Sequence, residues 1–243
     1  MPTTAKRAWK PGPLRPDLSH GALHVWLADL AAAEEGGADT LSEEERARAA
    51  RFLSERDRVL WMRSRQVLRA LLGRYLGREP HTVRMTSDCY GKPALVEQGA
   101  GLSDAGPAGV AGASALAFNL SHSDSLALYA FSRMGPVGVD VEVARRPIDA
   151  VAIATRTLGV QEARRLSAIA DPASRQREFL RVWTRHEAGL KCLGTGIGGS
   201  ATVADIKSLW AIELCIGPGA AAALAAIEAP TDISRWSWTQ VAA

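Results

Sequence analysis

The chain has 243 residues, of which 47% are apolar and 23% are charged, and its formal net charge at pH 7 is +3. This composition is typical of a globular protein with enough apolar side chains for a core, and so small a net charge says little about partners. The three cysteines are odd in number, lie far apart and form no C-x-x-C pair, which argues against a disulfide framework or a zinc site and for a reducing compartment.

The sequence predicts neither a signal peptide nor a membrane helix. Residues 1–20 contain no apolar run, and we interpret them as a disordered arm that carries prolines. No apolar stretch approaches the ~20 residues that a helix needs to span a bilayer. We therefore expect a cytoplasmic protein.

The first half of the chain predicts several strands and one long helix. Ser42 and Glu45 have the spacing of a capping box, which begins a short helix, and residues 57–76 have the apolar spacing of a long amphipathic helix. Turns are predicted at residues 90–93 and 121–124. Strands are predicted at residues 23–30, 83–86, 94–97, 117–120 and 126–132.

The second half repeats the order of these elements. A strand at residues 137–143 and a short helix at 158–170 precede a long helix, for which Asp171 is the N-cap and Pro172 the first residue. This helix runs to about Cys192 and ends at Gly194, and strands follow at residues 209–215 and 234–241. The recurrence predicts a duplicated unit, and the interface between two copies is a favoured place for a ligand cleft.

Two acidic residues share one face of the strand at residues 139–143 (VDVEV). Side chains two apart on a strand point the same way, so Asp140 and Glu142 lie side by side. Like charges this close repel unless one is protonated or a cation lies between them, and a hard divalent ion such as Mg²⁺ suits carboxylate oxygens. The alternative is an exposed edge strand with alternating acidic residues.

The predicted long helix carries Trp183, Glu187 and Lys191 on one face, because residues four apart align. Glu187 and Lys191 could form an ordinary surface ion pair. That reading leaves Gly189 unexplained, since glycine inside a helix costs roughly 1 kcal/mol relative to alanine. A glycine at this position indicates that another backbone or a ligand comes close.

A hydroxyl and an imidazole lie together in residues 118–123 (FNLSHS). Ser121 and His122 at a turn could bind phosphate oxygens. They are poorly placed as a nucleophile–base pair, because adjacent residues of an extended chain point to opposite faces. A structural role for His122 is an equal alternative.

The order of the motifs resembles the Sfp-type 4′-phosphopantetheinyl transferase superfamily. Residues 91–93 (GKP), 118–123 (FNLSHS), 138–142 (GVDVE) and 183–196 (WTRHEAGLKCLGTG) follow one another as in that family. Each motif is weak alone, but the ordered set is specific, and the resemblance covers about residues 23–212.

The resemblance implies an α+β fold. Members of the family are monomers of two similar halves related by pseudo-twofold symmetry, each a small antiparallel sheet packed on a long helix. Carried over to this chain, the halves are residues 21–135 and 136–243, after the N-terminal arm of residues 1–20.

The resemblance also implies the ligands of the site. The family binds Mg²⁺ and the pyrophosphate of coenzyme A through carboxylates that correspond to Asp140, Glu142 and Glu187. Glu187 is then the base, and Lys191 faces the phosphates. The residues implied in binding coenzyme A are Arg48, Lys92, Pro93, Ser121, His122, Asp140, Glu187 and Lys191.

The implied reaction moves the 4′-phosphopantetheine group of coenzyme A to a serine of an apo carrier protein and releases adenosine 3′,5′-bisphosphate. The carriers are those of fatty-acid, polyketide or nonribosomal-peptide synthases. Two departures from the family are His186, where lysine is common, and the Gly/Ala-rich segment 99–114, which we expect to be a flexible surface loop.

Two other functions stay open at this point. A Mg²⁺-dependent nucleotide phosphohydrolase would use the same carboxylates with water as the nucleophile. A nucleic-acid-binding module would use the arginine-rich segments 46–78 and 164–185, but the acidic residues would repel a phosphate backbone. We therefore expect neither nucleic acid nor membrane as a partner.

Overall fold

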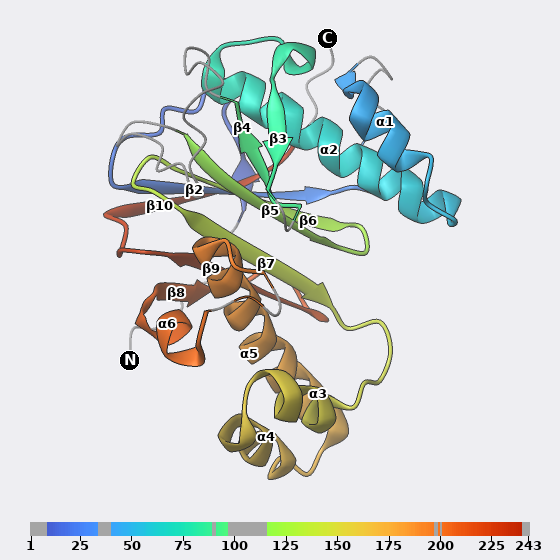
Figure 1. Cartoon of the computed structure of the whole chain (residues 1–243), viewed down its shortest axis with the longest axis vertical. Coiled ribbons are helices and arrows are strands. Elements are labelled where there is room, and N and C mark those ends of the chain that lie inside the picture. The colour runs from blue at the N-terminus through green and yellow to red at the C-terminus, as the bar shows by residue number, and fades with distance from the viewer. Residues whose placement is uncertain are drawn as a thin grey trace.

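Two sheets lie between two long helices. The computed structural model describes residues 9–33, 40–88, 91–96, 116–196, 199 and 201–239. In Figure 1 helix α2 (Glu55–Leu76) lies on one outer side and helix α5 (Pro172–Leu193) on the other, with the two sheets between them. The α+β class is as predicted.

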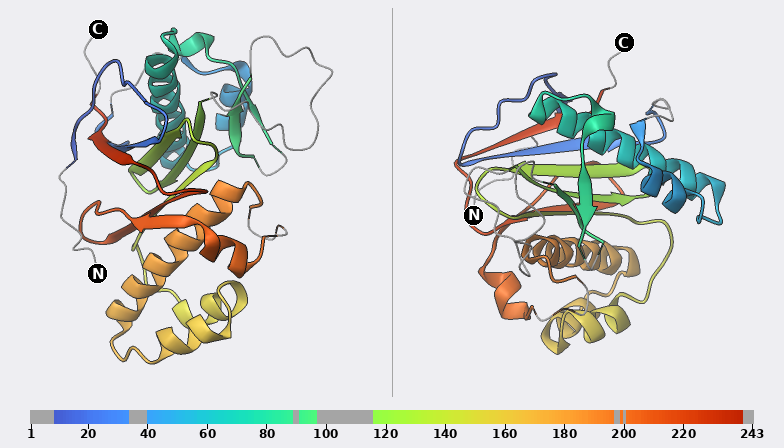
Figure 2. Two further views of the ribbon diagram at one scale, coloured as in Figure 1. Left: turned by 90° about the vertical axis from the view of Figure 1, so that its left-hand side faces the viewer. Right: turned by 45° about the horizontal axis from the view of Figure 1, so that its top comes forward.

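The first sheet has five strands in the order β1-β10-β2-β6-β5. They are β1 (Lys10–Pro11), β2 (Ala22–Asp29), β5 (Ala117–Ser123), β6 (Leu126–Ser132) and β10 (Asp232–Ser237). The C-terminal strand β10 runs parallel to both of its neighbours, whereas β2, β6 and β5 are antiparallel. Figure 2 shows β10, in red, alongside β2, in blue. This sheet is therefore mixed, and not antiparallel as predicted.

Helix α2 covers one face of this sheet. Its buried Leu68, Leu71 and Leu72 belong to one apolar cluster with Trp26 and Phe131 of the sheet. The helix begins two residues earlier than predicted because Ser54 accepts a hydrogen bond from the backbone N–H of Asp57. It ends as predicted, with Gly77 in the left-handed conformation (φ 63°).

The capping box predicted from Ser42 and Glu45 is present at the start of helix α1 (Glu43–Ala49). A 3₁₀ turn, η2 (Pro80–Thr82), leads from α2 to the hairpin of β3 (Met85–Ser87) and β4 (Pro93–Leu95). The Gly/Ala-rich segment 99–114 lies outside the described residues.

The turn predicted at residues 121–124 is wrong in its position. Strand β5 continues through Ser123, and the chain turns at Asp124, which has a positive φ of 56°. Aspartate tolerates this left-handed conformation better than most residues, which allows so tight a turn before β6. Ser121 and His122 are therefore strand residues with side chains on opposite faces.

The second sheet is antiparallel, with the order β7-β9-β8. Strands β7 (Val137–Val143) and β8 (Trp210–Glu213) were predicted, whereas the central strand β9 (Ala220–Ala226) was not. Alanine is poor in strands, so its sequence AAAALAA gives no strand signal. In the structure Ala223 and Ala225 are buried against Ala188 and Cys192 of α5, where small side chains let the helix approach the sheet.

Helix α5 has the N-cap Asp171 and the C-cap Gly194 that the sequence predicted. The short helix predicted at residues 158–170 is present as α4 (Val160–Ser167). A further helix that was not predicted, α3 (Ala150–Thr157), precedes it, and the two meet at Gly159 (φ 92°). Helix α6 (Val203–Ser208) was not predicted. It explains Gly189, because a Cβ atom there would lie 2.6 Å from the side chain of Ile206 in α6.

The N-terminal arm is ordered from Trp9 onward, in contrast to the prediction of disorder through residue 20. Trp9 Nε1 donates to the carbonyl of Cys215 at 2.7 Å, strand β1 pairs with β10, and Leu18 is buried. Residues 1–8 lie outside the described part. The division into halves 21–135 and 136–243, and the pseudo-twofold relation between them, stay predictions.

None of the helices in the described part of the chain combines the length and the apolar character needed to cross a membrane.

Candidate active site

Strand β7 presents Asp140 and Glu142 at the boundary between the two sheets. Asp140 is buried, and its Oδ1 accepts hydrogen bonds from Ser121 Oγ at 2.8 Å and from Lys191 Nζ at 2.7 Å. Its second oxygen, Oδ2, is also buried but has no hydrogen-bond partner among the described residues. Glu142 Oε2 accepts from Ser123 Oγ at 3.0 Å.

Helix α5 brings Glu187 to the same place. Burial raises the pKa of Glu187 to about 7, and the negative charge of Asp140 adds to the increase. Burial and Asp140 also raise the pKa of Glu142. Each of these two shifts includes a contribution from Asp140, so Glu142 and Glu187 both lie near that carboxylate.

The approach of α5 to β7 depends on Gly138. A Cβ atom on this residue would lie 1.9 Å from the carbonyl oxygen of Ala188 and 2.5 Å from the backbone nitrogen of Cys192. Only glycine allows this contact between strand and helix. The contact lies beside Glu187 and Lys191, and it sets the distance of both side chains from Asp140.

The residues present fit a hard divalent cation in their chemistry. Among the residues that the structure describes, no three His, Cys, Asp or Glu side chains form a ready-made metal cluster. Asp140 Oδ2 and Glu187 Oε1 are nevertheless both buried without a hydrogen-bond partner in that part of the chain. An unpartnered carboxylate oxygen is costly to bury, and a cation coordinated between the two would remove that cost.

Two lysines from different elements meet beside the carboxylates. Lys191 Nζ donates to Ser121 Oγ at 2.9 Å as well as to Asp140. Lys92, in the turn before β4, donates from Nζ to the backbone oxygen of Lys191 at 2.5 Å, and burial lowers its pKa. The hairpin of β3 and β4 is thereby attached to the last turns of α5.

A cavity of about 540 Å³ opens beside this cluster. Seven of the residues predicted from the sequence to bind coenzyme A or to act in catalysis line it: Arg48, Lys92, Pro93, Ser121, His122, Glu187 and Lys191. They come from helices α1 and α5, strands β4 and β5, and the turn before β4. With Arg65 added, four basic side chains face one hollow, which suits a ligand with several phosphate groups.

Sequence reasoning missed the tryptophan between two of these cations. The guanidinium carbons of Arg48 and Arg65 lie 5.5 and 5.9 Å from the centre of a ring of Trp61. Buried Glu45 accepts from Arg65 Nε at 2.9 Å and from Arg69 Nε at 2.6 Å, which fixes Arg65 in place. The four-residue spacing of Trp61 and Arg65 on one face of α2 was the available signal.

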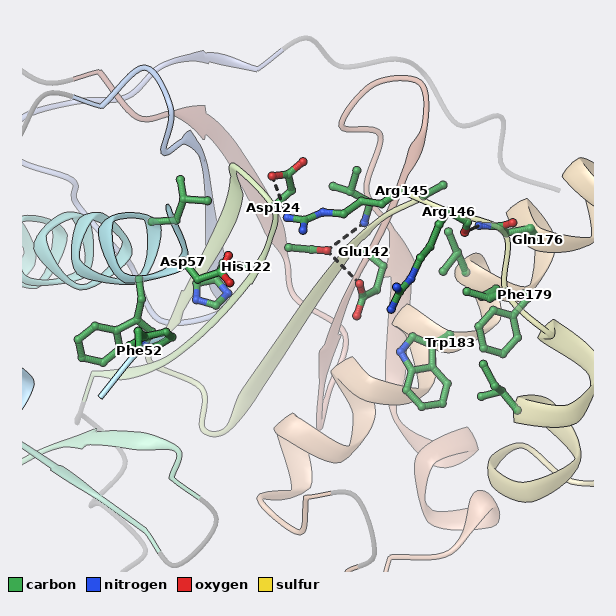
Figure 3. Close-up of a pocket in the computed structure, with 18 residues that line it drawn as sticks. Phe52, Asp57, His122, Asp124, Glu142, Arg145, Arg146, Gln176, Phe179 and Trp183 are labelled. Atoms are coloured by element: carbon green, nitrogen blue, oxygen red, sulfur yellow. Dashed lines mark hydrogen bonds and ion pairs between the residues drawn. The ribbon is translucent and has the colours of Figure 1, made fainter. Parts of the chain in front are cut away.

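A second cavity, of about 550 Å³, lies on the other side of the carboxylates. Figure 3 shows Phe52, Asp57 and His122 along one wall, Phe179 and Trp183 along the other, and Glu142 between them. Arg145 lies at its edge, where it is paired with Asp124 at 2.8 Å.

The two cavities adjoin, because Trp61 and His122 line both. Glu142 faces the second cavity, and Glu187 and Lys191 face the first, so the carboxylate cluster lies between two hollows of different character. Sequence reasoning did not find the second cavity, although Phe179 continues the row of Trp183, Glu187 and Lys191 at four-residue spacing on α5.

His186 lines neither cavity. Its ring centre lies 6.4 Å from that of Trp183, and burial lowers its pKa, which favours the neutral form at neutral pH. A contact between His186 and a phosphate therefore has no support from the geometry.

Two family models cover most of the described chain. Residues 136–239 match the 4′-phosphopantetheinyl transferase superfamily, and residues 34–133 match the N-terminal part of 4′-phosphopantetheinyl transferase. The 4′-phosphopantetheinyl transferase HetI of Nostoc sp. is 35% identical over 195 residues, which are 79% of this chain and 77% of HetI. A Synechocystis sp. protein, slr0495, which bears the same transferase name provisionally, is 31% identical over 159 residues, 65% of this chain and 59% of that protein.

Proposed function

Because the chain belongs to the 4′-phosphopantetheinyl transferase superfamily, we propose that it moves the phosphopantetheine group of coenzyme A to a serine of an apo carrier protein with the help of Mg²⁺. The observation that carries this proposal is the convergence of Asp140, Glu142, Glu187 and Lys191 between two adjoining cavities. We further propose that the protein acts in the cytoplasm as a monomer.

The cavity with the basic lining receives the nucleotide end of coenzyme A in this proposal. Arg48, Arg65 and Lys92 supply positive charge on one side of it and Lys191 on the other. Cations in a partly buried hollow bind phosphate groups more strongly than the same cations on an open surface, because less water screens them. The pyrophosphate then lies beside Lys191 and the carboxylates.

Asp140, Glu142 and Glu187 would hold Mg²⁺, with Asp140 Oδ2 and Glu187 Oε1 as the oxygens that have no partner among the described residues. The ion would offset the negative charge that develops on the pyrophosphate as its phosphoanhydride bond breaks. Lys191 is held by Asp140 and Ser121 at a position from which its ammonium group can stabilise the leaving phosphate.

Glu187 is the base of the proposed reaction. The serine oxygen attacks the β-phosphorus, its proton passes to Glu187, and adenosine 3′,5′-bisphosphate leaves. Burial and the charge of Asp140 raise the pKa of Glu187 to about 7 in the protein without a cation. A bound Mg²⁺ would lower this pKa, so that the carboxylate is ionised and can accept the proton. The serine enters from the side of the second cavity, where Glu142 is exposed to it.

The phosphohydrolase alternative has no support from the relatives, since both HetI and slr0495 bear transferase names. A direct experiment separates the two reactions. Apo acyl carrier protein and apo peptidyl carrier domains are incubated with the enzyme, coenzyme A and Mg²⁺, and their masses are measured. A transferase adds phosphopantetheine to one serine; release of adenosine 3′,5′-bisphosphate with every carrier unmodified would contradict the proposal.

A further inference from the structure

Strands β5 and β7 form the boundary between the two sheets without pairing as strands. Strand β5 is the last of the five-stranded sheet and β7 the first of the three-stranded sheet, and both are fully described. The side of β7 that faces away from β9 therefore has no ladder partner among the strands that the structure describes. Its backbone N–H groups still need hydrogen-bond acceptors, because this part of the chain is buried.

Side chains of β5 supply acceptors for two of these groups. Asn119 Oδ1 accepts from the backbone N–H of Val139 at 2.9 Å, and Ser123 Oγ accepts from the backbone N–H of Val143 at 3.1 Å. Residues 119, 121 and 123 alternate along the strand, so their side chains point to the same side. Together with Ser121 they make a row of side-chain hydrogen bonds in place of a backbone ladder.

The two backbone contacts enclose the acidic pair. Val139 directly precedes Asp140, and Val143 directly follows Glu142. Because Ser123 Oγ accepts from Val143, its own hydroxyl proton is free to point at Glu142 Oε2, 3.0 Å away. One hydroxyl thus fixes both the backbone beside Glu142 and the direction of its carboxylate. The dashed lines at Glu142 in Figure 3 mark these interactions.

We propose that Asn119 and Ser123 are positioning residues of the transferase, which hold the strand of Asp140 and Glu142 so that both carboxylates face the cation site. This inference rests on the proposed function. Groups that orient metal ligands without touching the metal commonly change metal affinity 10–100-fold when they are removed, an order of magnitude we expect here. A hydrogen bond that served stability alone would leave metal affinity unchanged.

The test uses the full-length enzyme, coenzyme A and Mn²⁺, a hard divalent cation whose free concentration is measured by electron paramagnetic resonance. We expect Ser123→Ala to weaken Mn²⁺ binding at least about tenfold and to lower transfer to an apo carrier. Ser123→Thr keeps the hydroxyl, and its extra methyl group has room because residue 123 lines the second cavity, so it restores binding. Asn119→Ala should weaken Mn²⁺ binding in the same way.

Ser132→Ala is the matched control. Ser132 is a buried serine of the neighbouring strand β6 whose Oγ accepts from the backbone N–H of Met134 at 3.0 Å, away from the carboxylates. Thermal unfolding should show that Ser132→Ala loses stability as Ser123→Ala does. The Mn²⁺ affinity of Ser132→Ala should remain that of the wild type.

Wild-type Mn²⁺ affinity in Ser123→Ala, or an equal loss in Ser132→Ala, would overturn the inference. If the wild-type enzyme transfers phosphopantetheine but does not bind Mn²⁺, the proposed metal site and this inference are both wrong, while the transferase assignment stands. A wild-type enzyme that binds Mn²⁺ but modifies no carrier would instead contradict the proposed function.

Discussion

At the scale of single residues, the site combines groups that would destabilise the protein without a ligand. Glu187 has a raised pKa because it is buried next to Asp140, and each of them keeps an oxygen without a partner among the described residues. Such arrangements are typical of functional sites, where stability is lost in exchange for chemistry. Substitutions of Glu187, Lys191 and Arg48 test whether these three side chains have the different roles that the geometry indicates.

Glu187→Gln should stabilise the ligand-free protein at pH 8 while it abolishes transfer. The folded-state pKa of about 7 lies above the ordinary 4.5, so the folded protein disfavours the ionised form of Glu187. The resulting loss of stability grows as the pH rises from 4.5 and reaches its full size above pH 7. We expect a gain of about 1–3 kcal/mol at pH 8, which fades as the pH falls from 7 to 4.5. Urea unfolding at pH 4.5, 6 and 8 measures this gain in the free energy of unfolding. An equal gain at all three pH values would show that it does not come from the ionisation of buried Glu187.

Lys191→Ala and Arg48→Ala should affect different kinetic constants. Lys191 contacts Asp140 at the reacting centre, so its removal lowers kcat, by about tenfold or more. Arg48 lines the basic cavity from helix α1, where its guanidinium group lies over Trp61, so its removal raises KM for coenzyme A with a smaller effect on kcat. Arg185→Ala, an exposed cation of the same helix, is the control and should leave both constants unchanged.

At the scale of elements, helix α5 carries two of the reacting groups, and its distance from β7 decides where they lie. Gly138→Ala would place a Cβ atom 1.9 Å from the carbonyl oxygen of Ala188, so the helix must shift. Overpacking of this kind typically costs 1–3 kcal/mol, and we expect about that loss of stability together with a fall in kcat.

Gly135→Ala provides the comparison for that substitution. Gly135 has a positive φ of 126° but nothing within 4 Å of its added Cβ atom, so the change strains only the local backbone. Thermal unfolding should detect a loss in both variants, but transfer should fall only in Gly138→Ala. Equal transfer rates would show that the distance between α5 and β7 does not control the site.

The elements predicted correctly are those with a local physical signal. Ser42 and Asp171 cap helices, and Gly77 and Gly194 end them, because caps are made by residues adjacent in sequence. Strand β9 was missed because its alanines carry no strand preference and are chosen for their small size against α5. The contact between these alanines and α5 exists only in the folded protein, so the sequence pattern around them could not reveal it.

The residues of the site also divide into those that the sequence could predict and those that it could not. The motif residues could be identified one by one, since their order along the chain resembles a known family. The second cavity could not, because its walls come from the segment after α1, from α2, β5, β7 and the segment after β7, and from α3 and α5, and no local pattern joins them. The network of Glu45 with Arg65 and Arg69 also joins residues 20 and 24 positions apart.

At the scale of the whole molecule, strands from early and late in the chain lie in one sheet. Strand β10 pairs with β2, so the five-stranded sheet is complete only when residues beyond 230 are present. Residues 21–135 alone would lack this strand and its neighbour β1. The two sheets share the boundary of β5 and β7, and the carboxylates lie on it, so the site needs both parts of the chain.

His24 makes the stability of this sheet depend on pH. It is buried on β2, with Nδ1 2.8 Å from the hydroxyl of Tyr75 and its ring against Trp236 of β10. Burial lowers its pKa to about 4, although the charges of Asp232 and Asp17 oppose the shift. Below pH 6.5 the unfolded chain therefore takes up a proton that the folded protein excludes, and stability is lost as the pH falls toward 4.

The expected loss is about 1.4 kcal/mol for each pH unit in that window, in addition to the contributions of other groups. Urea unfolding between pH 7 and 4.5 measures it. The variant His24→Gln, which keeps a polar group for Tyr75 but cannot titrate, should have a shallower slope. An unchanged slope would show that His24 is protonated in the folded protein as easily as in the unfolded chain.

The binding of coenzyme A by calorimetry, with and without Mg²⁺, tests most directly whether the carboxylates and the basic cavity form one site. For the wild type, Mg²⁺ should tighten binding; for Asp140→Ala, coenzyme A should still bind through the basic cavity, but Mg²⁺ should no longer change its affinity. If Mg²⁺ tightens binding equally in both proteins, the carboxylates of β7 do not hold the ion, and the account of this site is wrong.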